Sequence, residues 1–211
     1  IESRMQAIGM RLNHNKCEWF SDTDPSPYAN WETPKGCIKI LGAYHGHEHN
    51  VREALNRLSA SKHDQFFSNL AEVRDVAAIT ILAACAIPRM NYILRVHEPE
   101  LNEECCRYFD AKVTAAWVTI AEVDTTDPIT RDIAHLDCSF GGCGFTRSAD
   151  IRELAYFASY SFAFQHEHTI LTQRELKAAH MKRIYDNIVN QGGSCRAHLE
   201  ECRHPGTADW F

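Results

Sequence analysis

The sequence predicts a mainly α-helical protein with a small β-hairpin near its N-terminus. Past Gly42, the pattern is helical for most of the chain. Before that point, in residues 37–41, Ile38 and Ile40 alternate with Lys39 in the period of two that a half-buried strand requires. The length of 211 residues and the 45% hydrophobic content are those of a folded protein with a sizeable core. We therefore expect a helical bundle preceded by a hairpin.

The expected elements follow in order along the chain. Residues 1–10 form the end of a helix, where Gly9 stands at a position that favours a left-handed turn. Two short strands are expected over residues 16–20 and 37–41, with a loop containing several prolines between them. Helices are expected over residues 50–72, 75–97, 100–123, 148–165, 172–190 and 195–203.

One stretch, from Val76 to Ile87, is apolar on nearly every face, which predicts the central buried helix of the bundle. Pro88 should kink or interrupt that helix, because it lacks an amide donor and clashes with the preceding turn. Beyond it, Arg89, Tyr92 and Arg95 recur every three residues and share one helical face. The apolar run is too short to span a membrane, so no membrane contact is expected.

Composition narrows the possible functions. The net charge is −6, whereas nonspecific nucleic-acid binders usually carry a basic surplus. Any nucleic-acid role must therefore use local patches. The most basic stretch, residues 174–183, is usually interpreted as a solvated helix face. Nine cysteines, an odd number with one adjacent pair, indicate reduced intracellular thiols, which places the protein in the nucleus or cytoplasm.

Two clusters contain possible metal ligands. Residues 45–49 include three histidines, and residues 195–204 include two cysteines and two histidines. Neither spacing matches a standard zinc signature, so the sequence assigns no metal ligand. For the first cluster we expect a polar loop, with Asn50 capping the next helix. A zinc-bound module remains an alternative for the second.

No catalytic signature stands out, and the glycines of residues 141–144 lack the strand and lysine of a P-loop. A turn with Ser148 capping the next helix is expected there. The aromatic residues of that helix offer a base-stacking surface as one interpretation. Core packing is the other, because a stripe at helical spacing is formed by Ile151, Leu154, Ala155, Ala158 and Phe162.

Six weak motifs occur in a fixed order. Residues 8–18 read Ile-Gly-Met-Arg-Leu-Asn-x-x-Lys-Cys-Glu, and residues 38–46 read Ile-Lys-Ile-Leu-Gly-Ala-x-x-Gly. The other four lie at residues 85–95, 109–113, 141–149 and 205–211. In this order the segments resemble the C-terminal part of the reverse transcriptases of non-long-terminal-repeat retrotransposons. The first is similar to the fourth palm motif and the second to the primer-grip hairpin.

The resemblance implies that residues 1–46 end an α/β palm domain and that residues 47–211 form a helical thumb and connector. It implies an RNA-directed DNA polymerase, which transfers deoxynucleotides to a DNA primer on an RNA template with the help of Mg²⁺. The aspartates that hold Mg²⁺ in this family lie upstream of Ile1. The chain is therefore expected to be a fragment that needs no cofactor and does not polymerise by itself.

The resemblance also assigns roles to residues. Lys16 matches a palm lysine proposed as the general acid for the leaving pyrophosphate, and the alternative is a surface lysine beside a strand. The primer grip would consist of Ile38, Lys39, Ile40, Leu41 and Gly42. The residues expected to contact the template and primer are Arg89, Asn91, Tyr92, Arg95, Lys177, Lys182 and Arg183. For Arg89 and Arg95, the alternative is an ion-pair network with Asp75, Glu98 or Glu100.

A second function remains open from the sequence: a non-catalytic helical interaction module, either a domesticated remnant of such an enzyme or unrelated to one. The net charge of −6 and the acidic segment 43–124 favour this module. The ordered motifs favour the polymerase.

Overall fold

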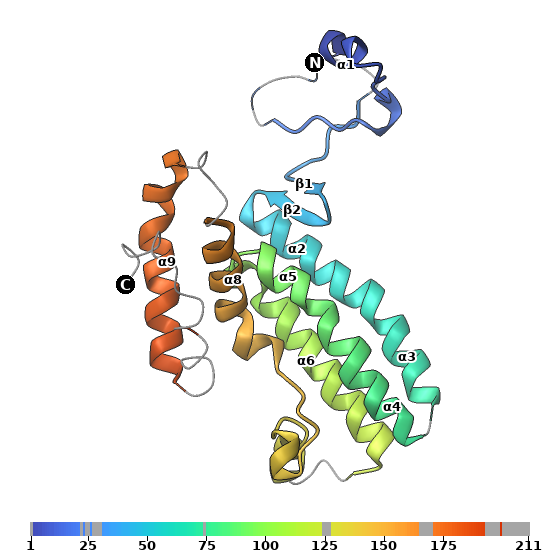
Figure 1. Cartoon of the computed structure of the whole chain (residues 1–211). Coiled ribbons are helices and arrows are strands. Elements are labelled where there is room, and N and C mark those ends of the chain that lie inside the picture. The colour runs from blue at the N-terminus through green and yellow to red at the C-terminus, as the bar shows by residue number, and fades with distance from the viewer. Residues whose placement is uncertain are drawn as a thin grey trace. The chain divides into compact units, whose positions relative to one another are not determined.

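The computed structural model shows a mainly helical protein with one small antiparallel hairpin, as the sequence predicts (Figure 1). Two compact units divide the chain between Glu53 and Ala54. The structure describes residues 2–21, 23, 26, 31–73, 75–123, 128–164, 171–192 and 199. The helix expected over residues 195–203 lies outside these residues, apart from Leu199.

The strand expected over residues 16–20 is not formed. His14–Lys16 is instead a short 3₁₀ turn, and the amide of Asn15 donates to the side chain of Asn13 at 3.2 Å. A local side-chain bond of this kind offers the backbone an alternative to a strand ladder. Beyond the turn, only an isolated bridge to Glu32 remains of the expected strand.

The hairpin is formed by β1 (Cys37–Ile40) and β2 (Ala43–Gly46), with Ile40 opposite Ala43. Leu41 and Gly42 make the two-residue loop, and their φ angles are +49° and +92°. Positive φ at both loop positions is the pattern of a type I′ turn, whose twist matches that of the strands. Glycine adopts this conformation freely, whereas a leucine is strained in it.

Helices make up most of the remaining described chain. They are α1 (Glu2–Ala7), α2 (Glu48–Leu58), α3 (Asp64–Glu72), α4 (Val76–Ile81), α5 (Asn91–Val96), α6 (Pro99–Ala121), α7 (Pro128–Ile133), α8 (Ser148–Phe164) and α9 (Leu171–Gln191). Each of the five long helical intervals expected before residue 191 is present, with ends within two residues of the prediction. The short helix α7 and the 3₁₀ turn η5 (Cys138–Phe140) were not expected.

Two of the helical intervals contain π-helical turns. The first, η2 (Ser59–His63), joins α2 to α3. The second, η3 (Leu82–Ala86), continues from α4 and passes into the 3₁₀ turn η4 (Ile87–Met90). Pro88 lies in this 3₁₀ turn and cannot donate a backbone hydrogen bond, which confirms the predicted interruption of the α-helix.

The central helix of the second unit is α6, and the prediction of a central helix over residues 76–87 is wrong. α6 packs against α3, α4, α5 and α8. The apolar stretch before Pro88 instead leaves Ala77, Ile81 and Ala84 exposed. Alanine adds little apolar area, so an alanine-rich helix gains little from burying every face.

The interval Ala77–Val96 is long and apolar enough, by length and composition alone, to cross a membrane. This corrects the exclusion made from the sequence, which considered only the run before Pro88. The core helix of a water-soluble protein passes the same test. Leu82, Met90 and Leu94 of this interval are fully buried within the protein, so the finding is weak evidence for a membrane span.

The buried face of α8 differs from the expected stripe. Phe162 is 62% exposed, and the other four residues of the stripe are only partly buried. Instead, Tyr156 and Phe157 form a core with Met181 and Ile184 of α9. α8 contacts α5 and α6 as well as α9, so it buries more than one face, and a single stripe does not describe it.

A side chain from α6 caps the N-terminus of α8. The carboxylate of Asp110 accepts hydrogen bonds from the backbone amides of Ser148 at 2.8 Å and Ala149 at 2.9 Å. Ser148 is the first residue of the helix, so the prediction that it caps the helix is wrong. Burial raises the pKa of Asp110, and the two backbone hydrogen bonds offset part of that rise. This contact fixes the start of α8 against α6.

Replacing Asp110 should therefore destabilise the second unit. We expect Asp110→Ala to lower the free energy of unfolding by about 2 kcal/mol, because two partly buried backbone amides lose their acceptor. Asp110→Asn should cost less, since its amide oxygen still accepts. Urea unfolding followed by circular dichroism measures both variants, and an alanine variant as stable as the parent chain would contradict the capping role.

Candidate nucleic-acid interface

The hairpin presents an apolar tip beside a lysine. Ile40 is 50% exposed and Leu41 is 94% exposed, whereas Ile38 is partly buried. The strand register places Lys39 opposite Tyr44, and the lysine Nζ lies 5.4 Å from the centre of that ring. A cation at this distance from an aromatic ring is held by the ring's quadrupole. Of the predicted primer-grip residues, Lys39, Ile40 and Leu41 are therefore exposed, whereas Ile38 and Gly42 are partly buried.

Lys16, the residue expected as a general acid, is exposed at the end of its 3₁₀ turn. A pocket of about 360 Å³ elsewhere in the first unit is lined in part by Lys39 and Ile38 of the hairpin and by Glu18 and Glu32. Two carboxylates beside one lysine would repel a phosphate, so this pocket is not a phosphate site.

A second surface is formed by η4 and α5. Arg89, Asn91, Tyr92 and Arg95 are all exposed on it, and Tyr92 is 46% exposed. In the part of the chain that the structure describes, neither Arg89 nor Arg95 forms an ion pair. The network with acidic residues that the sequence left open for these two arginines is therefore not formed there.

The guanidinium of Arg89 is held in place from two sides. Its central carbon lies 4.0 Å from the centre of the Phe66 ring, and its Nε donates to the carbonyl oxygen of Cys85 at 3.2 Å. Stacking on an aromatic face suits the planar guanidinium. Neither contact uses the terminal Nη groups, which remain available for a bidentate contact with an anion.

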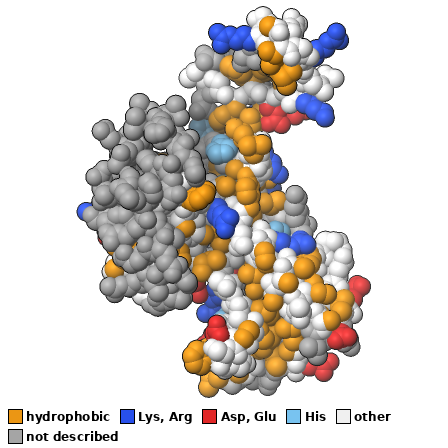
Figure 2. Space-filling view, in the orientation of Figure 1, with side chains coloured by type: hydrophobic (Ala, Val, Ile, Leu, Met, Phe, Trp, Pro, Cys, Tyr) orange, Lys and Arg blue, Asp and Glu red, His pale blue; other side chains and the backbone are white. Residues whose placement is uncertain are grey.

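The residues of α9 that were predicted to contact nucleic acid differ in their exposure and in their partners. Lys182 is exposed, and the side chain of Lys177 lies outside the described residues. Arg183 donates to a carboxylate oxygen of Glu100 and lies 3.0 Å from Nδ1 of His180. Arg183 is therefore already partnered within the protein. Figure 2 shows scattered Lys and Arg side chains, without a continuous basic surface, on the face in view.

The histidines of residues 45–49 do not share one extended face. β2 ends at Gly46 and α2 begins at Glu48, so the three imidazoles belong to a strand, a junction and a helix. Asn50 lies inside α2, and the prediction that it caps this helix is wrong. The cluster over residues 195–204 lies outside the described residues, apart from Leu199.

The adjacent cysteines of α6 are buried and unsuited to nucleophilic chemistry. Burial raises the pKa of Cys105 to about 11 and raises that of Cys106 further. Because the thiolate is the reactive form, neither residue is poised for catalysis at neutral pH. Cys85 and Cys138 are exposed free thiols.

Comparison with known proteins adds one relative. No family model matches the chain, and no solved structure matches it. The chain is 28% identical over 148 residues to the retrotransposable element SLACS 132 kDa protein of Trypanosoma brucei gambiense. The match covers 69% of this chain and 12% of that protein. The similarity supports a retrotransposon-related origin.

Thiol labelling provides a test of the burial pattern. In the native protein we expect iodoacetamide to modify Cys85 and Cys138, and to spare Cys105 and Cys106 until the chain is unfolded, because burial suppresses both access and thiolate formation. Peptide mapping by mass spectrometry identifies the modified sites, with a sample labelled in urea as the control. Modification of Cys105 in the native state would contradict the packing of α6.

Proposed function

We propose that the chain is the C-terminal part of a retrotransposon RNA-directed DNA polymerase and that it binds the template and primer. The surface of η4 and α5 would contact the phosphate backbone, and the hairpin would hold the 3′ end of the primer. The observation that carries this proposal is the pair Arg89 and Arg95, two exposed cations without an ion pair among the described residues. The ordered motifs and the similarity to a retrotransposon protein support it.

Arg89 is well suited to bind a phosphate. Its contacts with Phe66 and Cys85 restrict the side chain before any ligand is bound. Less side-chain entropy is then lost on binding, and the planar fork can meet two phosphate oxygens at once. Tyr92 lies between the two arginines in sequence and adds an exposed ring that can pack against a sugar or base. Such contacts position a duplex without reading its sequence.

The hairpin would add apolar contact at the primer end. Leu41 accepts a strained conformation at the tip of the turn while remaining 94% exposed, so burial within this unit does not explain its presence. A residue that is both strained and exposed is a candidate for contact with a ligand.

The chemistry of nucleotide addition would take place outside this chain. The proposal locates the Mg²⁺-binding aspartates in the preceding palm motifs, and none of the residues described above replaces them. Within the same proposal, Lys16 is the group that would supply a proton to the leaving pyrophosphate. The chain's own residues would bind and orient the template and primer.

A non-catalytic interaction module is the second candidate, favoured by one surface of the second unit. Ile129, Ile133, Leu136 and Phe140 are exposed over α7 and η5, and Phe140 is 80% exposed. Exposed apolar side chains mark a protein-binding site where they form one patch. This candidate predicts no specific role for Arg89 or Arg95.

The double variant Arg89→Ala with Arg95→Ala separates the two functions. We expect weaker binding to an RNA–DNA primer-template, and a salt dependence reduced by about one unit of slope for each lost phosphate contact. Fluorescence anisotropy over a series of salt concentrations measures both quantities.

The matched control removes two other exposed charges, Arg107 and Arg147. These arginines pair with Glu103 and Asp132 within the protein. Arg107→Ala with Arg147→Ala should therefore leave the salt slope nearly unchanged. If the two double variants weaken binding equally, only total charge matters, and the proposed interface is wrong.

The hairpin tip is tested by Leu41→Asn. Asparagine tolerates positive φ, and Asn-Gly is the preferred type I′ pair, so the hairpin should be stabilised by about 0.5–1 kcal/mol. Hydrogen exchange of the hairpin amides measures this gain. Binding to the primer-template should nevertheless weaken, because the apolar tip is lost.

Gly42→Ala is the comparison for this variant. It keeps Leu41 but places a Cβ at a φ of +92°, so it should destabilise the hairpin. If Leu41→Asn binds the primer-template as tightly as the parent chain, the tip has no part in binding.

A further inference from the structure

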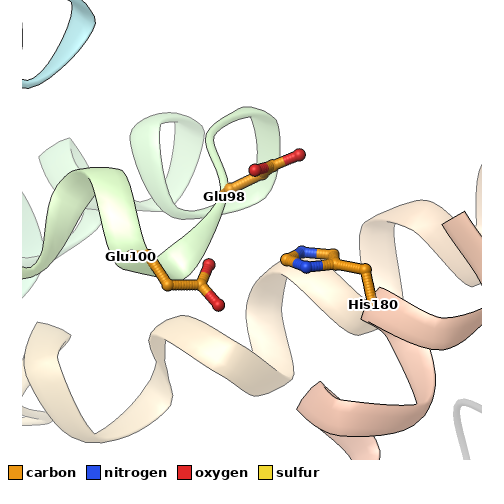
Figure 3. A group of neighbouring side chains, drawn as sticks. All are labelled: Glu98, Glu100 and His180. Atoms are coloured by element: carbon orange, nitrogen blue, oxygen red, sulfur yellow. The ribbon is translucent and has the colours of Figure 1, made fainter. Parts of the chain in front are cut away.

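Three side chains with metal-ligating atoms meet where the start of α6 approaches α9. Glu98 immediately precedes α6, Glu100 lies in its first turn, and His180 lies on α9 (Figure 3). One ligand atom from each residue lies within 4.8 Å of the other two. The three residues come from distant parts of the sequence, so the fold brings them together.

His180 is incompletely satisfied in this arrangement. Its Nε2 is buried and has no hydrogen-bond partner among the described residues. Its Nδ1 lies 3.0 Å from a terminal nitrogen of Arg183. Since a guanidinium can only donate, Nδ1 is the ring atom placed to accept in this contact. A buried polar atom without a partner is costly, and neutral imidazole is the form that binds metals.

Two carboxylates, those of Glu98 and Glu100, place negative charge beside His180. Among the described residues, Arg183 donates to Glu100. Burial raises the pKa of the nearby Tyr156 hydroxyl, and the charges of Glu98 and Glu100 raise it further. The Tyr156 ring also meets the His180 ring edge-on, with centres 6.2 Å apart. A cation is therefore favoured beside the partly buried imidazole.

We propose that Glu98, Glu100 and His180 form a binding site for a divalent transition-metal cation, and that the cation displaces Arg183. Two carboxylates with one imidazole suit Mn²⁺ or Zn²⁺, and water would complete the coordination. Ligands about 2.1 Å from an ion lie at most about 4.2 Å apart, so the side chains would have to close by less than about 1 Å. The site would join α6 to α9.

Displacement of Arg183 is compatible with its position. The Arg183 side chain is 59% exposed, so it can move into solvent. Once it leaves, Nδ1 no longer has to accept from the guanidinium, and Nε2 can bind the metal as part of a neutral imidazole. The cation then gives the buried Nε2 the partner it lacks.

Mn²⁺ binding to the full 211-residue chain tests this site. Mn²⁺ is the probe because, as a hard cation, it discriminates against the cysteine thiols. Electron paramagnetic resonance measures the free ion during titration. We expect one Mn²⁺ site in the parent chain, with binding about tenfold or more weaker in His180→Ala and Glu100→Gln. Arg183→Ala should bind about tenfold more tightly, since the competing cation is gone.

Two neighbouring substitutions serve as matched controls. Glu104→Gln removes a carboxylate from α6, and Lys182→Ala removes a positive charge from α9, but neither residue belongs to the cluster. Both should bind Mn²⁺ like the parent chain. The proposal is overturned if His180→Ala binds Mn²⁺ normally, or if Arg183→Ala gains no more affinity than Lys182→Ala. Neither outcome bears on nucleic-acid binding by Arg89 and Arg95.

Discussion

Burial around α6 is the constraint on which the second unit depends. The ring of Phe109 on this helix meets His63 and Phe67 edge-on, with ring centres 4.9 Å and 5.6 Å away. The next residue, Asp110, caps α8, and α8 in turn forms a core with α9. One helix therefore connects the hydrophobic core, the start of a second helix and, through its own first turn, the cluster at His180.

Helix positions were more predictable from the sequence than burial. Helix ends follow from local signals, such as the interruption at Pro88 and the turn before Ser148. Burial depends on how many neighbours a helix has, which periodicity does not report. The expected stripe on α8 included Phe162, which is exposed, because α8 packs against helices on more than one side. The cap that Asp110 provides for α8 could not be predicted either, since this residue lies on another helix.

In the candidate sites too, features within one segment could be predicted from the sequence, whereas contacts between segments could not. The sequence could predict a shared face for Arg89, Tyr92 and Arg95 because that needs only helical spacing within one segment, and all three are exposed. The stacking of Arg89 on Phe66 could not, since it joins two helical intervals. The cluster at His180 requires α9 to return to the start of α6, and no local pattern records such a contact.

A net charge of −6 does not by itself oppose nucleic-acid binding. Charges more than about 10 Å from a ligand are largely screened at 0.1 M salt, so acidic side chains remote from the ligand act on it weakly. Affinity then depends on local cations. Arg89 and Arg95 are exposed cations on η4 and α5, so the charges near the ligand are a better guide to binding than the sum over the chain.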